Sequence, residues 1–503
     1  MSSLFPASRI DLTPNTGDFE NAPLIIPTGF REYDARWLFP EEINLMGVQA
    51  LGFGLGNVLH ELTDRPALVV GHDYRAYSQS IKLALITGLM AAGAEVHDIG
   101  LALSPVAYFA QYELDVPGVA MVTASHNENG WTGVKMGANR PLTFGPDEMD
   151  MLRNTVLEGT GVTRPCGSYH FVDDMAQRYM ADLTGRDSLK RKIKAVVACG
   201  NGTAGAFAPA VLEQVGIDVI PLHCDLDFTF PHHNPNPEDM EMLHALSKTV
   251  TNNGADIGFA FDGDGDRCGV VDNQGVEIFA DKMGVLVARD LAAKHPGAKF
   301  VADVKSTGLF LTDPVLQELG AQTAYWKTGH SYMKRHTVET GALAGFEKSG
   351  HFFFNPPIGR GYDDGLVTAL AICDMLEDNP DKSMADLRDS LPNTWGSPTM
   401  SPYCADTQKY AVVDRAVKHF EGLAAAGEKI AGQPIRDLVT VNGVRVTVED
   451  GTWGLVRASS NKPGLVVVVE SPVSEQRMRD MFAVIDGLLA SYEEVGEYDQ
   501  KLS

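Results

Sequence analysis

The segment that decides the fold is residues 67–99, ALVVGHDYRAYSQSIKLALITGLMAAGAEVHDI. An apolar strand at 67–70 is followed by a polar loop, by an amphipathic helix that ends at Gly93, and by a second strand at 96–99. A glycine directly after a helix is typical of a residue with left-handed backbone geometry. Two strands joined through one helix pair in parallel with a right-handed crossover. The segment therefore predicts a βαβ unit of an α/β protein.

The same order of elements occurs twice more along the chain. Residues 195–198 begin a second strand–loop–helix–strand unit, whose helix ends at Gly216. Residues 300–304 begin a third, whose helix ends at Gly320. The repeats lie too far apart for a solenoid, so they predict related domains in tandem.

The last part of the chain has a different pattern. Residues 439–448, 454–457 and 464–470 read as strands joined by turns, and residues 474–489 read as a helix. This is the pattern of a smaller α+β domain. The length of 503 residues, divided by about 150 residues per domain, also gives three to four domains.

The charge balance indicates which partners to expect. The chain has 41 basic and 66 acidic residues, a formal net charge of −25. Such a surface repels nucleic acid and anionic membranes, although a local cluster of cations can still bind an anionic small molecule. Six cysteines occur without a CxxC motif, and there is neither an apolar signal region nor a run of about 18 apolar residues. We therefore expect a cytoplasmic protein with reduced thiols and small-molecule partners.

The most informative motif is the acidic loop 262–267, DGDGDR, which follows the apolar strand 257–261. Carboxylates at alternate positions of a glycine-rich loop can converge on one hard cation, either Mg²⁺ or Ca²⁺. An EF-hand is a poor alternative, because Arg267 stands where that loop needs glycine and Asn273 where it needs glutamate. The loop leaves a strand end, where sites of α/β proteins form.

A second motif, TASHN at 123–127, follows the predicted strand 118–122. It presents the hydroxyl of Ser125 beside the imidazole of His126. It is not a nucleophile elbow, because Thr123 replaces the required glycine. Adjacent side chains point apart in an extended loop, so we expect Ser125 and His126 not to form a nucleophile–base dyad.

Three further clusters suit an anionic sugar. Residues 305–308 (KSTG) and 327–330 (KTGH) each follow a predicted strand with cations and hydroxyls. Residues 345–351 (GFEKSGH) present Glu, Ser and His at alternate positions, as recognition of sugar hydroxyls requires. Residues 457–463 (RASSNKP) offer a guanidinium, hydroxyls and turn amides to a phosphate. Each cluster taken alone is equally compatible with an ordinary polar loop.

Together and in this order, the motifs resemble the α-D-phosphohexomutase superfamily, in particular its bacterial phosphomannomutase/phosphoglucomutase branch. The resemblance extends from about residue 30 to residue 470. The opening signature of that branch resembles residues 30–36 (FREYDAR), its serine loop 123–135 and its sugar loop 347–351. The resemblance implies three related α/β/α domains with mixed sheets plus a C-terminal α+β domain, around a central cleft.

The expected domain boundaries follow the motifs. Residues 1–162 would form the α/β domain with the phosphoserine loop, and residues 163–275 the one with the metal loop. Residues 276–385 would carry the sugar-recognition loop, and residues 386–503 would form the phosphate-binding domain.

The resemblance also implies an activity. It is intramolecular phosphotransfer, the interconversion of hexose 6-phosphate and hexose 1-phosphate of mannose, glucose or both, through a phosphoserine and a 1,6-bisphosphate intermediate. One Mg²⁺ per chain would be the cofactor, and glucose 1,6-bisphosphate the activator. A phosphoglucosamine mutase and a sugar-phosphate phosphatase remain alternatives, and the oligomeric state and the pathway stay open.

The resemblance assigns roles residue by residue. Ser125 would carry the phosphoryl group, with Lys135 and His351 as acid/base groups. The implied catalytic residues are Ser125, His126, Lys135, Arg36, Arg267 and His351. The implied metal ligands are Ser125, Asp262, Asp264 and Asp266. The implied sugar- and phosphate-binding residues are Lys305, His330, Glu347, Ser349, Arg457, Ser459, Ser460 and Asn461.

Departures from the family pattern fall into two groups. Trp37 and Glu128 replace a usual glycine and proline and leave the catalytic groups in place. Lys348 replaces a usual methionine in the sugar loop, and Ser460 with Asn461 replaces a usual Asn-Thr pair in the phosphate loop. The second group therefore puts the sugar preference in doubt more than the type of reaction.

Overall fold

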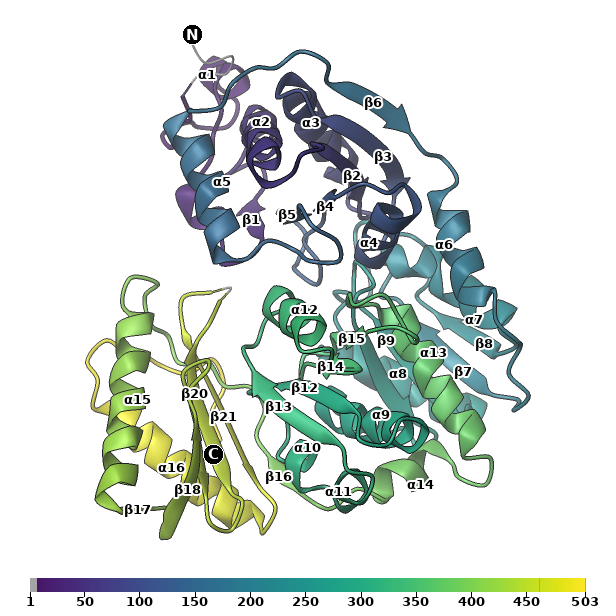
Figure 1. Ribbon diagram of the computed structural model, residues 1–503, viewed down its shortest axis with the longest axis vertical. Coiled ribbons are helices and arrows are strands. Elements are labelled where there is room, and N and C mark those ends of the chain that lie inside the picture. Colours follow the sequence, from purple (N-terminus) through teal and green to yellow (C-terminus); the bar gives the residue numbers. More distant parts are fainter. Residues whose placement is uncertain (1–6, 461, 503) are drawn as a thin grey trace. The chain divides into compact units, whose positions relative to one another are not determined.

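A computed structural model describes residues 7–460 and 462–502. The chain forms two compact units, which are described separately (Figure 1). The first comprises Met1–Phe279 with Ser349–Ala385, and the second Ala280–Lys348 with Asp386–Ser503. Within the described residues, no helix is both long and apolar enough to cross a membrane.

The first sheet of the first unit has the strand order β1-β5-β4-β2-β3-β6. Its strands are β1 (Ala35–Leu38), β2 (Ala67–His72), β3 (Glu95–Leu101), β4 (Gly118–Val122), β5 (Trp131–Gly137) and β6 (Ser168–Phe171). Strand β2 pairs in parallel with β3 and β4, whereas β5 runs antiparallel to β4 and β1. The sheet is therefore mixed, and β2 and β4 end at the same edge.

Helices α2 (Leu45–Leu62), α3 (Ser78–Ala91) and α5 (Pro146–Glu158) share one apolar core with strands β2 and β4. Helices α2 and α3 approach closely through glycines. A methyl group on Gly52 would lie 2.1 Å from the Leu85 carbonyl oxygen. The short loop after β2 is thereby fixed to a rigid layer.

The second sheet of the first unit has the order β11-β10-β9-β7-β8. Its strands are β7 (Lys194–Ala198), β8 (Asp218–Leu222), β9 (Ile257–Phe261), β10 (Cys268–Asp272) and β11 (Glu277–Ile278). Other elements of this unit are α4 (Ser104–Glu113), α6 (Met175–Thr184), α7 (Ala208–Gln214), α8 (Met240–Asn253), β15 (Phe352–Phe354) and α13 (Gly365–Asp378). The acidic loop connects β9 to β10, and every residue of β9 is buried.

The second unit contains the third repeat. Strands β12 (Lys299–Asp303), β13 (Gln322–Trp326) and β14 (Ala344–Phe346) pair in parallel in the order β13-β12-β14. The helices of this repeat are α9 (Ala280–Lys294), α10 (Leu309–Thr312), α11 (Pro314–Glu318) and α12 (His330–Glu339).

The predicted repeat is confirmed in all three copies. The two strands of each strand–helix–strand repeat pair in parallel: β2 with β3, β7 with β8 and β12 with β13. The glycines that end the helices have the expected left-handed geometry, with φ of 87° at Gly93, 98° at Gly216 and 69° at Gly320.

The C-terminal part of the second unit is an antiparallel sheet with two long helices. Its order is β16-β21-β20-β19-β18-β17, with β17–β21 paired antiparallel in succession. The elements are β16 (Trp395–Gly396), α15 (Lys409–Ala426), β17 (Lys429–Ile430), β18 (Gln433–Val439), β19 (Val444–Val448), β20 (Trp453–Ala458), β21 (Leu465–Ser471) and α16 (Glu475–Ala490).

One predicted strand is wrong at its start. The sequence favours a single strand over 439–448, but a turn separates β18 from β19. Gly443 has a φ of 74° in that turn, and a methyl group on it would lie 2.1 Å from the Val456 carbonyl oxygen. Left-handed geometry at Gly443 reverses the chain, which is why the two strands become a hairpin.

The third repeat and the C-terminal sheet are joined through the carboxylate of Glu470 on β21. One oxygen accepts hydrogen bonds from the Gly308 amide at 2.8 Å and the Thr307 hydroxyl at 3.0 Å. It also accepts one from the Trp453 indole at 3.1 Å. The other oxygen pairs with the Lys282 ammonium at 2.9 Å. Although burial alone would raise it, the Lys282 charge and the Gly308 amide lower the pKa of Glu470 to about 2.

This pKa shift predicts a pH-dependent contribution to stability. A folded-state pKa of about 2 against a usual 4.5 corresponds to roughly 3 kcal/mol above pH 5, lost as the pH falls from about 4.5 toward 2. We expect Glu470→Gln to lower the melting temperature by several degrees at pH 7 and by less than half as much at pH 3. Calorimetry at the two pH values measures this, and an equal decrease at both would contradict the assignment.

Candidate active site

The acidic loop between β9 and β10 is fully buried. Asp262, Asp264 and Asp266 are each 0% exposed, and their ligand oxygens lie within 4.8 Å of one another. Lys135 comes from β5, where it is paired with Met121 of β4. Its ammonium donates to Asp264 Oδ2 at 2.6 Å and also to Asp266. A cation from the first sheet thus contacts carboxylates that follow a strand of the second.

The protonation of this cluster follows from burial and charge. Burial and the neighbouring carboxylates raise the pKa of Asp262 well above its usual value. Burial alone would lower the pKa of Lys135, but Asp264 and Asp266 raise it well above its usual value. Burial alone would likewise raise the pKa of Asp264, yet Lys135 lowers it well below the usual range. Lys135 is therefore an ammonium ion, and it offsets only part of the cluster's negative charge.

The donor set fits a hard divalent cation. Asp264 Oδ1 and Asp266 Oδ1 are buried and have no hydrogen-bond donor within the described part of the chain. Buried carboxylate oxygens without donors are costly unless a cation binds them. Oxygen ligands are the set that hard divalent cations such as Mg²⁺ and Ca²⁺ prefer. The residues present therefore fit a hard divalent cation.

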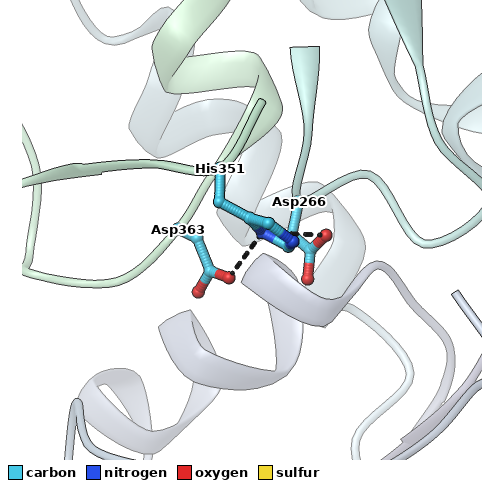
Figure 2. A group of neighbouring side chains, drawn as sticks. All are labelled: Asp266, His351 and Asp363. Carbon is cyan, nitrogen blue, oxygen red and sulfur yellow. Dashed lines mark ion pairs between the residues drawn. The ribbon is translucent and has the colours of Figure 1, made fainter. Parts of the chain in front are cut away.

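His351 lies beside the cluster (Figure 2). Its Nδ1 is 3.0 Å from Asp363 Oδ2 and 3.5 Å from Asp266 Oδ1. Its Nε2 accepts a hydrogen bond of 3.1 Å from Arg267 Nε. Because a guanidinium only donates, Nε2 is the unprotonated nitrogen and the ring proton is on Nδ1, the nitrogen nearer to Asp363 and Asp266. The ring is held in one tautomer.

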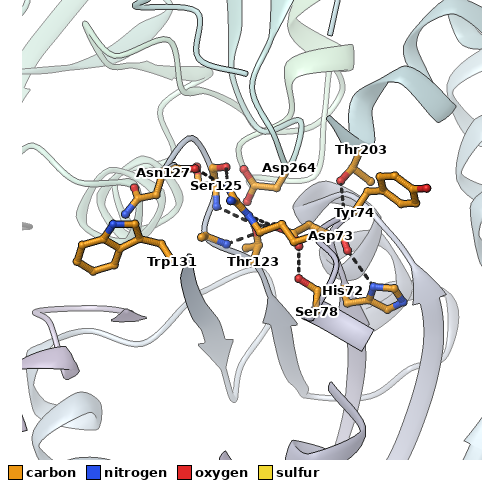
Figure 3. A network of polar contacts seen from close by, with 12 residues as sticks. His72, Asp73, Tyr74, Ser78, Thr123, Ser125, Asn127, Trp131, Thr203 and Asp264 are labelled. Atoms are coloured by element: carbon orange, nitrogen blue, oxygen red, sulfur yellow. Dashed lines mark hydrogen bonds and ion pairs between the residues drawn. The ribbon is translucent and has the colours of Figure 1, made fainter. Parts of the chain in front are cut away.

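Ser125 is placed by the loop that follows β4 (Figure 3). Its backbone φ is 51°, left-handed geometry that is uncommon for a residue other than glycine. The side chain is buried, and its hydroxyl donates to Asp262 Oδ2 at 3.0 Å. The Ser125 amide in turn donates to the Thr123 hydroxyl at 2.8 Å.

The expectation that Ser125 and His126 point apart is wrong. Ser125 Oγ lies 3.3 Å from His126 Nδ1, because the left-handed Ser125 makes the loop turn rather than extend. Arg267 also donates to His126 Nδ1. Burial, with the charges of Arg267 and Arg36, lowers the pKa of His126 well below its usual value. A neutral imidazole nitrogen therefore faces the hydroxyl.

Asp73, directly after β2, anchors the serine loop (Figure 3). Its carboxylate accepts hydrogen bonds from the Thr123 hydroxyl at 2.8 Å, the Ala124 amide at 3.3 Å and the Ser78 hydroxyl at 2.5 Å. It also pairs with Arg75 Nε at 3.2 Å. Both side chains of the ion pair are almost fully buried.

Arg75 completes the support from the same loop. One of its terminal nitrogens donates to the carbonyls of Ser125 at 3.0 Å and Asn127 at 2.6 Å. The other donates to the Glu128 carbonyl at 3.1 Å. The sequence analysis did not single out Asp73 or Arg75. The signal that could have found them is the parallel pairing of β2 and β4, which places the two loops at one sheet edge.

Arg36 joins the same group from β1. Its guanidinium donates to Asn127 Oδ1 at 3.1 Å and pairs with Asp34. All residues with an implied catalytic or metal-binding role lie in the first unit and connect through the contacts above. They are Arg36, Ser125, His126, Lys135, Asp262, Asp264, Asp266, Arg267 and His351.

Most residues implied in recognition lie in the second unit, and Asp303 at the end of β12 connects the loops that hold three of them. Its carboxylate accepts hydrogen bonds from the Ser306 hydroxyl at 2.5 Å, the Thr328 hydroxyl at 2.8 Å and the Lys348 amide at 3.2 Å. Asp303 therefore joins the loops that hold Lys305, His330 and Glu347, all three buried. The sequence did not identify Asp303 as a site residue. Ser349, also implied in recognition, belongs to the first unit.

The implied phosphate loop connects β20 to β21. Arg457 is buried and donates to the Ala458 carbonyl at 2.7 Å, while its Nε has no acceptor among the described residues. Lys409 of α15 donates to the Ser459 carbonyl at 2.6 Å and stabilises the loop. Ser460 is buried. Asn461 lies outside the described residues.

Comparison with known proteins finds one family between residues 27 and 488 of the chain. Four domain profiles of the phosphoglucomutase/phosphomannomutase family match: α/β/α domains I, II and III at residues 27–161, 170–275 and 279–395, and the C-terminal domain at 407–488. A phosphomannomutase/phosphoglucomutase of Pseudomonas putida is 35% identical over 463 residues, which cover 92% of this chain and 96% of that protein. The chain belongs to this family.

Two further relatives extend the comparison. A phosphoglucomutase of Neisseria meningitidis is 30% identical over 91% of this chain and 96% of its own length. The crystal structure of a phosphoglucomutase/phosphomannomutase family protein from Burkholderia thailandensis has a TM-score of 0.82 and 30% identity, over 93% of this chain and 98% of that one. The resemblance and the fold class inferred from the sequence are thereby confirmed.

The hydrogen bonds of Thr123 allow a direct test of the anchor in this family member. Thr123→Val removes the donor to Asp73 and the acceptor of the Ser125 amide, each worth about 1 kcal/mol. We expect hexose-phosphate turnover to fall about tenfold through kcat, with KM nearly unchanged. Thr155→Val on α5, where the hydroxyl donates to the Met151 carbonyl of its own helix, is the matched control. Equal kcat in the two variants would contradict the role of the anchor.

Proposed function

We propose that the chain interconverts hexose 6-phosphate and hexose 1-phosphate through a phosphoserine at Ser125. The observation that carries the proposal is the buried Ser125 hydroxyl, which donates a hydrogen bond to Asp262 of the carboxylate cluster. Two cations lie nearby: Lys135 contacts Asp264 of the same cluster, and Arg267 contacts His126. Membership of the phosphoglucomutase/phosphomannomutase family supports the same reaction.

The reaction consists of two transfers. In the first, the phosphorus–oxygen bond to Ser125 breaks, a bond to the free sugar hydroxyl forms, and that hydroxyl loses its proton to a base. In the second, the phosphorus–oxygen bond of the other phosphoryl group of the resulting 1,6-bisphosphate breaks, the sugar oxygen gains a proton, and the group returns to Ser125 Oγ, which loses its proton. The sugar must reverse its orientation between the transfers. Glucose 1,6-bisphosphate would serve as activator because it phosphorylates an unmodified Ser125.

Charged side chains would support the transferring group. Because Lys135 is protonated, it can neutralise negative charge and donate a proton to the departing Ser125 oxygen. Arg267 and Arg36 contact the serine loop and would neutralise the equatorial oxygens. His351, held in one tautomer, is the second proposed acid/base group.

The cofactor we propose is one Mg²⁺ per chain. Asp262, Asp264 and Asp266 would hold it together with phosphorylated Ser125. When bound, it supplies Lewis-acid neutralisation of the phosphoryl oxygens.

Residues of the second unit would recognise the sugar and its non-reacting phosphate. Lys305, His330 and Glu347 would orient the sugar, with Ser349 of the first unit. The proposed phosphate ligands are Arg457, Ser459, Ser460 and Asn461. We propose glucose and mannose as the sugars, since the Pseudomonas putida relative is named for both.

A product assay with a matched serine variant tests the proposal. Supplied with glucose 1-phosphate or mannose 1-phosphate, Mg²⁺ and glucose 1,6-bisphosphate, the protein should form the corresponding 6-phosphate. Ser125→Ala should lower kcat by at least about a thousandfold, because nucleophile loss typically costs more than that. Ser104→Ala removes a different serine, whose hydroxyl donates to Asp264. Intact mass should show that Ser125 is still phosphorylated in this variant. Full activity of Ser125→Ala would overturn the proposal.

A further inference from the structure

Lys348 lies in the loop 347–351, which we propose recognises the sugar. Its ammonium donates to Asp281 Oδ2 at 3.2 Å. The Asp281 carboxylate is 1% exposed and also accepts a hydrogen bond from the Thr307 amide at 2.9 Å. The side chain of Lys348 is thus bound to helix α9 and not free in solvent.

The backbone around Lys348 is fixed as well. The Lys348 amide donates to Asp303 Oδ1 at 3.2 Å. The preceding residue, Glu347, accepts a hydrogen bond from the Gly329 amide at 2.5 Å. Two consecutive residues of the loop therefore make contacts to α9, β12 and the start of α12.

The surroundings keep Lys348 charged. Burial alone would lower the pKa of Lys348, but the carboxylates of Asp281, Glu470 and Asp303 raise it above its usual value. The same interaction helps to lower the pKa of Glu470. The sugar loop is therefore coupled electrostatically to the residue that joins the C-terminal sheet to the third repeat.

We propose that Lys348 is a positioning residue that holds the sugar loop on Asp281 and makes no contact with the sugar itself. The inference rests on the proposed function and adds to it the role of this residue in recognition. Because the Lys348 ammonium binds Asp281, the neighbouring residues Glu347 and Ser349 would bind the sugar hydroxyls. Its contribution to catalysis is therefore the same for every hexose that the site accepts, so Lys348 does not set the preference between glucose and mannose.

Kinetics of a double-mutant cycle in the full-length protein test this proposal. Lys348→Met, Asp281→Asn and the double variant are compared with glucose 1-phosphate and mannose 1-phosphate. We expect each single change to lower kcat/KM about tenfold, mainly through KM, in keeping with a charged hydrogen bond. The decrease in kcat/KM should be equal for the two sugars. The double variant should also lose only about tenfold in kcat/KM, as each single variant does, because the two residues act as one pair.

Controls separate positioning from general damage. Lys294→Met removes an exposed ion pair with Asp290 on the same helix and should leave kcat/KM unchanged. Lys348→Arg retains the charge and should recover most of the activity. Intact mass should show unchanged phosphorylation of Ser125 in every variant, because Ser125 belongs to the other unit. If Lys348→Met does not fold, kcat/KM of Asp281→Asn and Lys348→Arg with the two sugars provides the same test.

Three results would overturn the proposal: unchanged kcat/KM in Lys348→Met, losses that add in the double variant, or a glucose-to-mannose ratio altered more than about threefold. The last would mean that Lys348 contacts the sugar. Failure of the proposed function is distinguishable, because then the parent protein converts no hexose phosphate. In that event, calorimetry still tests the role of Lys348 through the affinity for glucose 6-phosphate. Weaker binding by Lys348→Met than by the parent protein supports a positioning role, and equal binding contradicts it.

Discussion

The site depends on negative charge buried at the end of one strand. Asp262, Asp264 and Asp266 are removed from water, and the ammonium of Lys135 contacts only two of them directly. Buried carboxylates are costly unless they are paired or bind a metal ion. A phosphoryl group on Ser125 would add further negative charge to the same place. The surrounding guanidinium groups, with the divalent cation that we propose, would offset that charge, so the architecture favours a site that accepts phosphoryl groups.

The first and third repeats position their loops by the same device, an aspartate at or just beyond the end of a parallel strand. Asp73 accepts hydrogen bonds from a threonine hydroxyl, a serine hydroxyl and the Ala124 amide. Asp303 accepts them from a threonine hydroxyl, a serine hydroxyl and the Lys348 amide. In the first repeat the device fixes the serine loop, and in the third it fixes the loops implied in sugar recognition. Parallel strands end at one edge, so a single carboxylate can reach two or three loops.

The sequence predicted those parts of the fold that local patterns determine. The strands at 118–122 and 257–261 have the predicted bounds, because each is a short apolar run ended by polar residues. The contact between Ser125 and His126 was not predictable, because left-handed geometry at a serine has no local signal. Asp73 and Asp303 were missed for another reason: their partners are distant in sequence and meet them only in the folded sheet. Strand β18 was missed because its charged residues and Pro434 obscure the alternation.

We propose that phosphoryl groups pass between the sugar and Ser125 without transfer to water. The most direct measurement starts with protein phosphorylated on Ser125 from ³²P-labelled glucose 1,6-bisphosphate. The labelled protein is then mixed with unlabelled glucose 1-phosphate for a single turnover. We expect the label to leave Ser125 and to appear in glucose 1,6-bisphosphate and glucose 6-phosphate. Label released as inorganic phosphate, or label that stays on the protein while 6-phosphate forms, would contradict it.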